Sequence, residues 1–87
     1  MMDTRDIARI LEEGPPSARA ALAASRAAPP EALYYLMADR SPEIRTSVAA
    51  NPASPHQTYA VLAGDDDLAV RQALATRLAE LAPGLPP

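Results

Sequence analysis

The chain has 87 residues and a formal net charge of −3, and it contains no cysteine, phenylalanine or tryptophan. This length is that of one small domain, and the lack of cysteine excludes disulfides, iron–sulfur clusters and thiolate metal sites. All eight basic side chains are arginine, and the acidic total disfavours strong nonspecific attraction to nucleic acid or anionic lipid.

The first residues predict a pair of helices. Ile7, Ile10 and Leu11 have the spacing of one helical face, in a helix that begins near Asp3 or Thr4. Ala18 and Leu22 indicate a second helix after the glycine and prolines at 14–16. The segment MMDTRDIARILEEG lacks the order of a signal peptide, and no apolar run has membrane-spanning length. We therefore expect a cytoplasmic protein with no membrane partner.

Prolines mark the later helices. Pro30, Pro42 and Pro55 stand where a helix begins, because the first-turn N–H groups have no partner inside the helix. Ser54, with Gln57 three residues later, has the spacing of a capping box. Asn51 precedes a proline and is expected to end a helix. Together with the apolar spacing, these marks predict helices over residues 30–38, 42–50, 55–63 and 68–81.

Three arginines recur every 26 residues, and each has an acidic residue six positions before it: Glu13 with Arg19, Asp39 with Arg45, and Asp65 with Arg71. A fixed period of this length indicates stacked copies of one unit that has no closed core of its own. We therefore predict an all-α solenoid of about three helical pairs. It forms a single domain over residues 3–82, with units near 3–28, 29–54 and 55–82 and a disordered tail at 83–87.

Two strings carry a resemblance to known families. DRSPEIRTSVA, from Asp39 to Ala49, and its copy DDDLAVRQALA, from Asp65 to Ala75, resemble the core of HEAT-type repeats. The short period, the break at Asn51 and the following Pro55 are similar to the bacterial leucine-rich repeat variant, and RQALATRLAEL is similar to segments of uncharacterised bacterial HEAT-like proteins. The resemblance implies a right-handed stack of short helices, an α-α superhelix, that serves as a binding surface. Some leucine-rich repeat variant proteins carry an iron–sulfur module, which cannot be transferred to a chain without cysteine.

The repeated acid–arginine pairs predict a structural ladder made of Glu13, Arg19, Asp39, Arg45, Asp65 and Arg71. Each acid precedes the second helix of its pair and each arginine lies in that helix's first turn, so an arginine can bridge its own acid and the acid of the next unit. The alternative is that the column Arg19, Arg45 and Arg71 contacts successive phosphates of a nucleic acid. The acidic total and the aspartate run at 65–67 oppose that alternative.

Two aromatic residues are candidates for a binding surface. Tyr34 and Tyr35 are adjacent and would point about 100° apart on a helix, so one is expected to pack and the other to project. Tyr59 is expected in the core with its hydroxyl at the rim. The last helix carries an extra apolar stripe of Leu74, Leu78 and Leu81. This stripe is either a terminal cap or a face that accepts another repeat, from a longer chain or from a second copy.

No motif indicates catalysis. His56 is the only histidine and lies beside a proline in a first helical turn, a position typical of a solvated surface residue. The aspartate run does not have the alternating ligands of a calcium loop, and Asp66 or Asp67 is expected to cap a helix. We expect no enzyme activity, no catalytic residue, no cofactor and no metal.

The sequence therefore favours a noncatalytic protein-interaction or scaffold module whose partner is an unidentified protein. The possible partner surface comprises Tyr34, Tyr35, Thr46, Gln72, Thr76, Arg77 and Leu78. A homo-oligomer through the terminal repeats is a further possibility, so a purely self-associating repeat remains an alternative. Nucleic-acid binding is the disfavoured alternative.

Overall fold

The computed structural model describes residues 3–81. Across that range the chain is helical and has no strand: α1 (Thr4–Glu13), α2 (Pro16–Ala24), α3 (Pro30–Leu36), α4 (Pro42–Ala50), α5 (Gln57–Ala63) and α6 (Leu68–Leu81). The predicted all-α class is therefore confirmed for the described residues. The tail predicted at 83–87 lies outside them, as does the last residue of the predicted domain.

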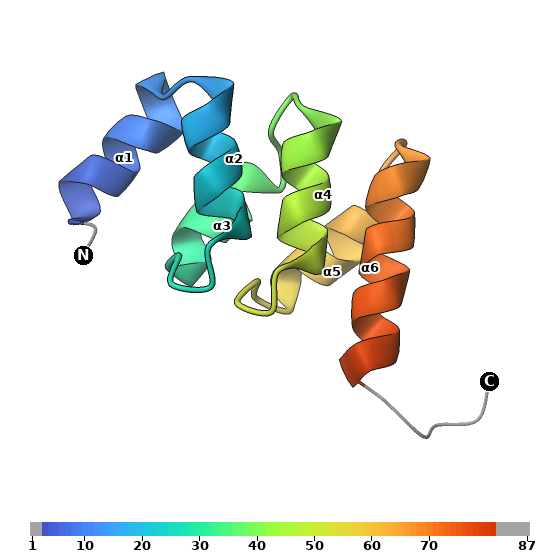
Figure 1. Ribbon diagram of the computed structural model, residues 1–87. Coiled ribbons are helices and arrows are strands. Elements are labelled where there is room, and N and C mark those ends of the chain that lie inside the picture. Colours follow the sequence, from blue (N-terminus) through green and yellow to red (C-terminus); the bar gives the residue numbers. More distant parts are fainter. Residues whose placement is uncertain (1–2, 82–87) are drawn as a thin grey trace.

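The helices form an elongated arrangement of 44 × 26 × 18 Å. In Figure 1, α2, α4 and α6 stand side by side, while α3 and α5 lie behind them and α1 lies beyond α2. The central helix α4 contacts α2 on one side and α6 on the other. Within the part of the chain described, α1 and α6 are consequently the two ends of the arrangement. None of the described helices is both long enough and apolar enough to cross a membrane.

Proline starts three of the helices at their first position: Pro16 in α2, Pro30 in α3 and Pro42 in α4. The prediction for the next helix is wrong by two residues, because α5 begins at Gln57 rather than at Pro55. Ser54 is buried and donates its hydroxyl to the carbonyl of Val48, at 2.7 Å, instead of capping α5. That carbonyl lies in the last turn of α4, where backbone acceptors have no partner inside the helix.

The core lies between the row formed by α2, α4 and α6 and the helices α3 and α5 behind it (Figure 1). Its largest fully buried side chains are Leu22, Leu33, Leu36, Ile44, Val48, Thr58, Leu62 and Val70. Ala23, Ala32 and Ala49 are also fully buried, and their small side chains let the helices approach closely. Helix α1 contributes no fully buried residue, and Ile7, Ile10 and Leu11 are only partly buried against this core.

Tyr59 packs against the core but is only partly buried, and its ring lies 5.4 Å from that of His56. Thr58 occupies the buried stripe instead, four residues before Leu62, and its hydroxyl donates to the carbonyl of Pro55 at 2.7 Å. A threonine can be buried here because this local hydrogen bond satisfies its hydroxyl.

Candidate functional site

Arg19 of α2 joins the first helical pair to the second. Its Nε donates to Oδ2 of Asp39 at 2.7 Å, and its Nη2 donates to Oδ1 at 3.4 Å. Asp39 follows α3 and also accepts the backbone N–H of Ser41, at 3.0 Å. The side chains of Arg19 and Asp39 are only 16% and 7% exposed. The pair is therefore a two-point, largely buried link of the strong, geometrically specific kind.

Arg45 of α4 repeats this arrangement at the next junction. Its Nε and Nη2 donate to the two carboxylate oxygens of Asp65, at 2.8 and 3.2 Å. Asp65 accepts the backbone N–H of Asp67, at 2.9 Å, just as Asp39 accepts that of Ser41. In both junctions the arginine reaches the acid that lies 20 residues later in the chain.

The expected bridge from each arginine to the carboxylate of its own unit does not form. The Nη1 of Arg45 donates to the backbone carbonyl of Asp39, at 2.8 Å, and that of Arg71 to the carbonyl of Asp65, at 2.5 Å. The arginine therefore reaches the backbone of its own acid, while that acid's carboxylate binds the preceding arginine. Each acid thus serves two arginines through different atoms.

The first pair departs furthest from the expectation. Glu13 is exposed, and Arg19 donates its Nη1 to the carbonyl of Gly14, at 2.8 Å, rather than to Glu13. Glu13 is the last residue of α1, and two positions later stands Pro15, which has no N–H to donate. The backbone bond that orients Asp39 and Asp65 therefore cannot form at Glu13.

The electrostatics agree with these contacts. Burial raises the pKa of Asp39, but the bonds from Arg19 and from the N–H of Ser41 outweigh it and hold that pKa below its ordinary value. The hydrogen bond from Arg45 likewise lowers the pKa of Asp65. The same bonds raise the pKa of both arginines. Their guanidinium groups are thus committed to aspartates, which leaves Arg19 and Arg45 poorly placed to bind phosphates.

Asn51 forms a second link between α2 and α4, at their other ends. Its Nδ2 donates to the carbonyls of Ala23 and Ser25, at 2.8 and 2.9 Å, and its Oδ1 accepts the N–H of Ala53 at 2.9 Å. The residue is buried. Sequence reasoning identified Asn51 only as the end of a helix, although its position 26 residues after Ser25 is the signal that places it at the junction.

The tyrosine pair lies on the outer face of α3. Both side chains are exposed, Tyr34 by 51% and Tyr35 by 55%, so the expectation that one of them packs is wrong. The buried stripe of α3 is filled by Ala32, Leu33 and Leu36, and no helix described here covers the opposite face.

Two hollows meet at Tyr35, along the seam between α1 and α3. The larger, of 630 Å³, is lined in part by Leu11, Glu12, Tyr34 and Met37. The smaller, of 450 Å³, is lined in part by Ile7, Ala8, Pro29 and Ala32. Leu11, Glu31 and Tyr35 line both hollows. This surface, which we call the tyrosine seam, therefore combines exposed aromatic area and apolar depressions with the carboxylates of Glu12 and Glu31. The larger hollow is also lined by Arg19, Asp39 and Arg40.

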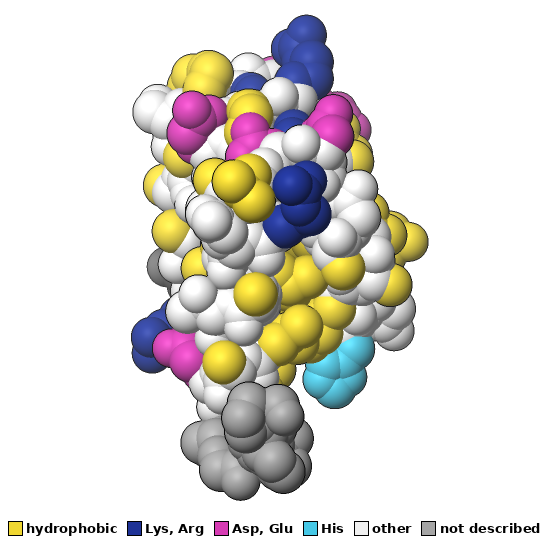
Figure 2. Space-filling view, turned by 90° about the vertical axis from the view of Figure 1, so that its right-hand side faces the viewer, with side chains coloured by type: hydrophobic (Ala, Val, Ile, Leu, Met, Phe, Trp, Pro, Cys, Tyr) yellow, Lys and Arg dark blue, Asp and Glu magenta, His cyan; other side chains and the backbone are white. Residues whose placement is uncertain are grey.

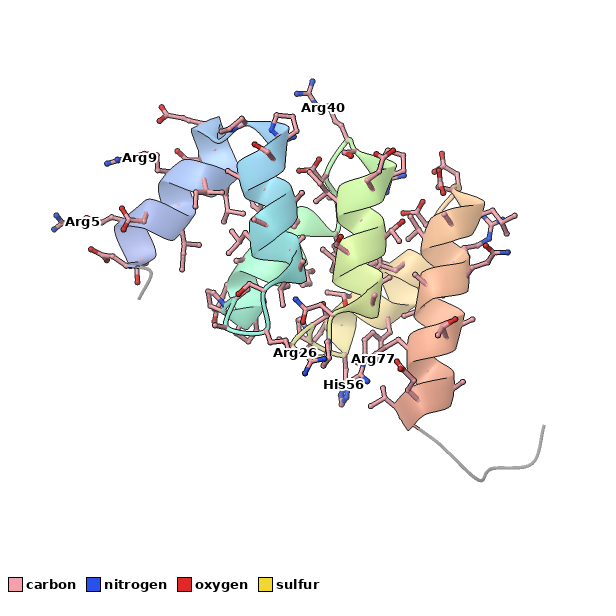
Figure 3. The ribbon with its side chains drawn as sticks, viewed as in Figure 1. Arg5, Arg9, Arg26, Arg40, His56 and Arg77 are labelled. Carbon is pink, nitrogen blue, oxygen red and sulfur yellow. The ribbon has the colours of Figure 1, made fainter. Side chains whose placement is uncertain are left out.

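The other predicted surface residues do not join this seam. Gln72, Thr76 and Leu78 are exposed on α6, and Thr46 of α4 is partly buried with its hydroxyl bound to the carbonyl of Pro42. Arg77 is partly buried, and its Nε has no hydrogen-bond partner among the described residues. Figure 3 shows Arg26, His56 and Arg77 toward the end of the molecule where α4 finishes. The predicted surface is thus divided among three helices, α3, α4 and α6.

A scan against protein-family models found no match, and searches of the curated proteins and of the solved structures returned none either.

Proposed function

We propose that the chain is a noncatalytic protein-interaction module built as a short, right-handed α-solenoid of the HEAT-like, leucine-rich repeat variant type. Two regularities support the repeat architecture. Helices α2, α4 and α6 begin at residues 16, 42 and 68, and the contacts of Arg19 with Asp39 recur for Arg45 with Asp65. Each is displaced by the 26-residue period of the sequence.

The observation that carries the binding function is the exposed tyrosine pair above the two hollows. Aromatic side chains provide large contact areas and are frequent anchors of protein interfaces. Tyr35 stands between the hollows, and the partly buried Leu11 lines both. A partner that places one apolar side chain in each hollow would enclose Tyr35 between its contacts.

The charges beside the seam indicate the chemistry of that partner. Glu12 and Glu31 line the larger hollow together with Arg19 and Arg40, but among the described residues neither glutamate receives the arginine hydrogen bonds that Asp39 receives. A basic residue on the partner would complement these carboxylates. We therefore propose a partner segment with two apolar anchors and a neighbouring arginine or lysine, as an amphipathic helix would provide.

The test uses a matched pair of variants in the complete chain. A partner is captured from the native host with the wild-type chain, identified, purified, and titrated against Tyr35→Ala and Val61→Ala. Val61 is similarly exposed, by 51%, but lies on α5 and lines neither hollow. Tyr35→Ala is expected to weaken binding about tenfold or more, and Val61→Ala to leave it unchanged. Equal affinities for both variants would contradict the proposed surface.

No observation favours the nucleic-acid alternative. Its column would need free guanidinium groups, and the forks of Arg19 and Arg45 bind aspartates. Fluorescence-anisotropy titrations of labelled RNA and DNA are expected to show no salt-dependent binding. A steep salt dependence would reopen that alternative.

A further inference from the structure

The arginine ladder leaves one unmatched group at each end of the described chain. Arg19 binds Asp39 and Arg45 binds Asp65, each across 20 residues. Arg71 holds the same place in the third helical pair, but among the described residues it reaches only a backbone carbonyl and no carboxylate. Glu13 is the acid of the first pair and is exposed, and no arginine of the residues described, 3–81, binds its carboxylate. Arg71 and Glu13 are therefore the arginine and the acid from which one more contact of the same kind could be built.

The two ends also differ from the middle in burial, because residues that are buried on one helix are exposed at the equivalent position of an end helix. Ala23 of α2 and Ala49 of α4 are fully buried, whereas the equivalent Ala75 of α6 is exposed. In the opposite direction, Ser47 and Ala73 are partly buried, whereas the equivalent Ala21 of α2 is exposed. The positions that are covered on α4, which has a helix on each side, are therefore exposed on α6 at one end of the row and on α2 at the other.

The open side of α6 combines the unmatched arginine with apolar area. Arg71 and Ala75 lie one turn apart, and the exposed Leu68 and Leu78 stand a turn before and after them on the same side of the helix. Figure 2 looks onto this end and shows hydrophobic side chains along the molecule, with basic and acidic groups gathered toward the start of α6.

We propose that a second copy of this chain occupies the open side of α6, head to tail, with its Glu13 accepting hydrogen bonds from Arg71. The proposal rests on the stacked architecture in the proposed function and uses a surface distinct from the tyrosine seam. Glu13 suits the role because Pro15, two residues later, has no N–H to hold its carboxylate as Ser41 holds that of Asp39. Its longer side chain can therefore turn toward an arginine of another molecule. Such an interface is heterologous, so it extends into a ring or a filament.

Charge reversal tests the pairing. Sedimentation velocity is measured over a concentration series for the wild type, for Arg71→Glu, for Glu13→Arg and for an equimolar mixture of the two variants. Each variant alone brings like charges together, two carboxylates or two guanidiniums, and is expected to self-associate at least about tenfold more weakly than the wild type. In the mixture both junctions become complementary, so association is expected to return.

The control is Arg40→Glu, because Arg40 is exposed and projects from the start of α4 rather than from either end helix (Figure 3). It is expected to associate like the wild type. Leu78→Glu adds a charge to the apolar stripe and is expected to abolish association. Circular dichroism checks that every variant retains its helices.

A wild type that stays monomeric at all concentrations would overturn the proposal, as would single reversals that associate normally or a mixture that does not recover. The tyrosine seam provides the separate readout. Tyr35→Ala is expected to self-associate like the wild type, and failure of the mixture experiment would leave partner binding at the seam unaffected.

Discussion

Helices α4 and α1 show how much a helix in this protein depends on its neighbours. Both carry apolar residues at helical spacing, yet α4 buries Ile44, Val48 and Ala49 completely, while α1 buries no residue completely. Helix α4 packs between α2 and α6, whereas the main neighbours of α1 among the described helices are α2 and α3. The apolar pattern therefore determines which face turns inward, and the presence of a helix on each side determines how far it is buried.

The polar links follow the same division. Helix α4 is held near its start by Arg45 and just after its end by Asn51, and both residues reach other helical pairs. At α1, Asp3 accepts the N–H of Arg5 at the N-cap, a bond between near neighbours in an exposed segment. We infer that the middle of the stack is more stable than its ends. Two of the variant pairs described next compare the middle with α1 and with α6, and the pH dependence tests the ladder that joins them.

The largest expected effect comes from deleting a core side chain in the middle. Ile44→Ala is expected to lower the free energy of unfolding by about 2–5 kcal/mol, because the lost burial is accompanied by a cavity. Ile10→Ala in α1, where the same side chain is only partly buried, is expected to lower it by less than about 2 kcal/mol. Urea denaturation measures both. If Ile44→Ala does not fold, Ile44→Val replaces it, and equal losses in α1 and α4 would refute the comparison.

The next effect distinguishes an interior ladder arginine from the terminal one. Arg45→Ala leaves Asp65, which is 9% exposed, without its main partner. It is expected to lower the free energy of unfolding by about 1–3 kcal/mol. Arg71→Ala removes only a bond to a carbonyl at an exposed site and is expected to change it by less than about 0.5 kcal/mol.

Arg45→Lys is the matched control for the first of these variants. It keeps the charge but cannot make the two-point contact, so we expect incomplete rescue. Equal thermal stability of Arg45→Ala and the wild type would show that the ladder does not stabilise the fold.

The smallest effect is a dependence on pH. The pKa values of Asp39 and Asp65 are lower in the folded chain than their ordinary value. Their contribution to stability is therefore complete above the unfolded value, about 3.9, and is lost as the pH falls through the lower folded values. Thermal unfolding from pH 6 to pH 2 should show this decrease. The double variant Asp39→Asn/Asp65→Asn should show a shallower one, and an identical slope would contradict the assignment.

The helix positions followed closely from local chemistry in the sequence. Pro42 and the Asn51–Pro52 step predicted α4 with both of its ends, and the apolar spacing predicted α6 over residues 68–81. Local chemistry was insufficient at α5, because Ser54 donates to the carbonyl of Val48 instead of capping α5. Which of these two bonds Ser54 makes depends on its burial against α4, and a local sequence pattern does not predict that burial.

The period identified the ladder residues and predicted that each arginine can bridge its own acid and the acid of the next unit. It did not predict that only one of these two contacts would involve a carboxylate: Arg19 binds the carboxylate of Asp39, the acid of the next unit, and not that of Glu13. Two helices must be placed side by side before the acid 20 residues later becomes the nearer one. The exposure of both Tyr34 and Tyr35 was likewise unpredictable, since it depends on whether any helix covers the outer face of α3.

The bonds that join the helical pairs have a consequence for how the chain folds. The links made by Arg19, Arg45 and Asn51 close segments of only 20 to 28 residues. Short closures of this kind give rapid, low-contact-order folding, and structure in a tandem array can nucleate at more than one place and spread to adjacent units. We therefore expect refolding to begin around α4, where two such closures converge, and α1 to be the last helix to dock.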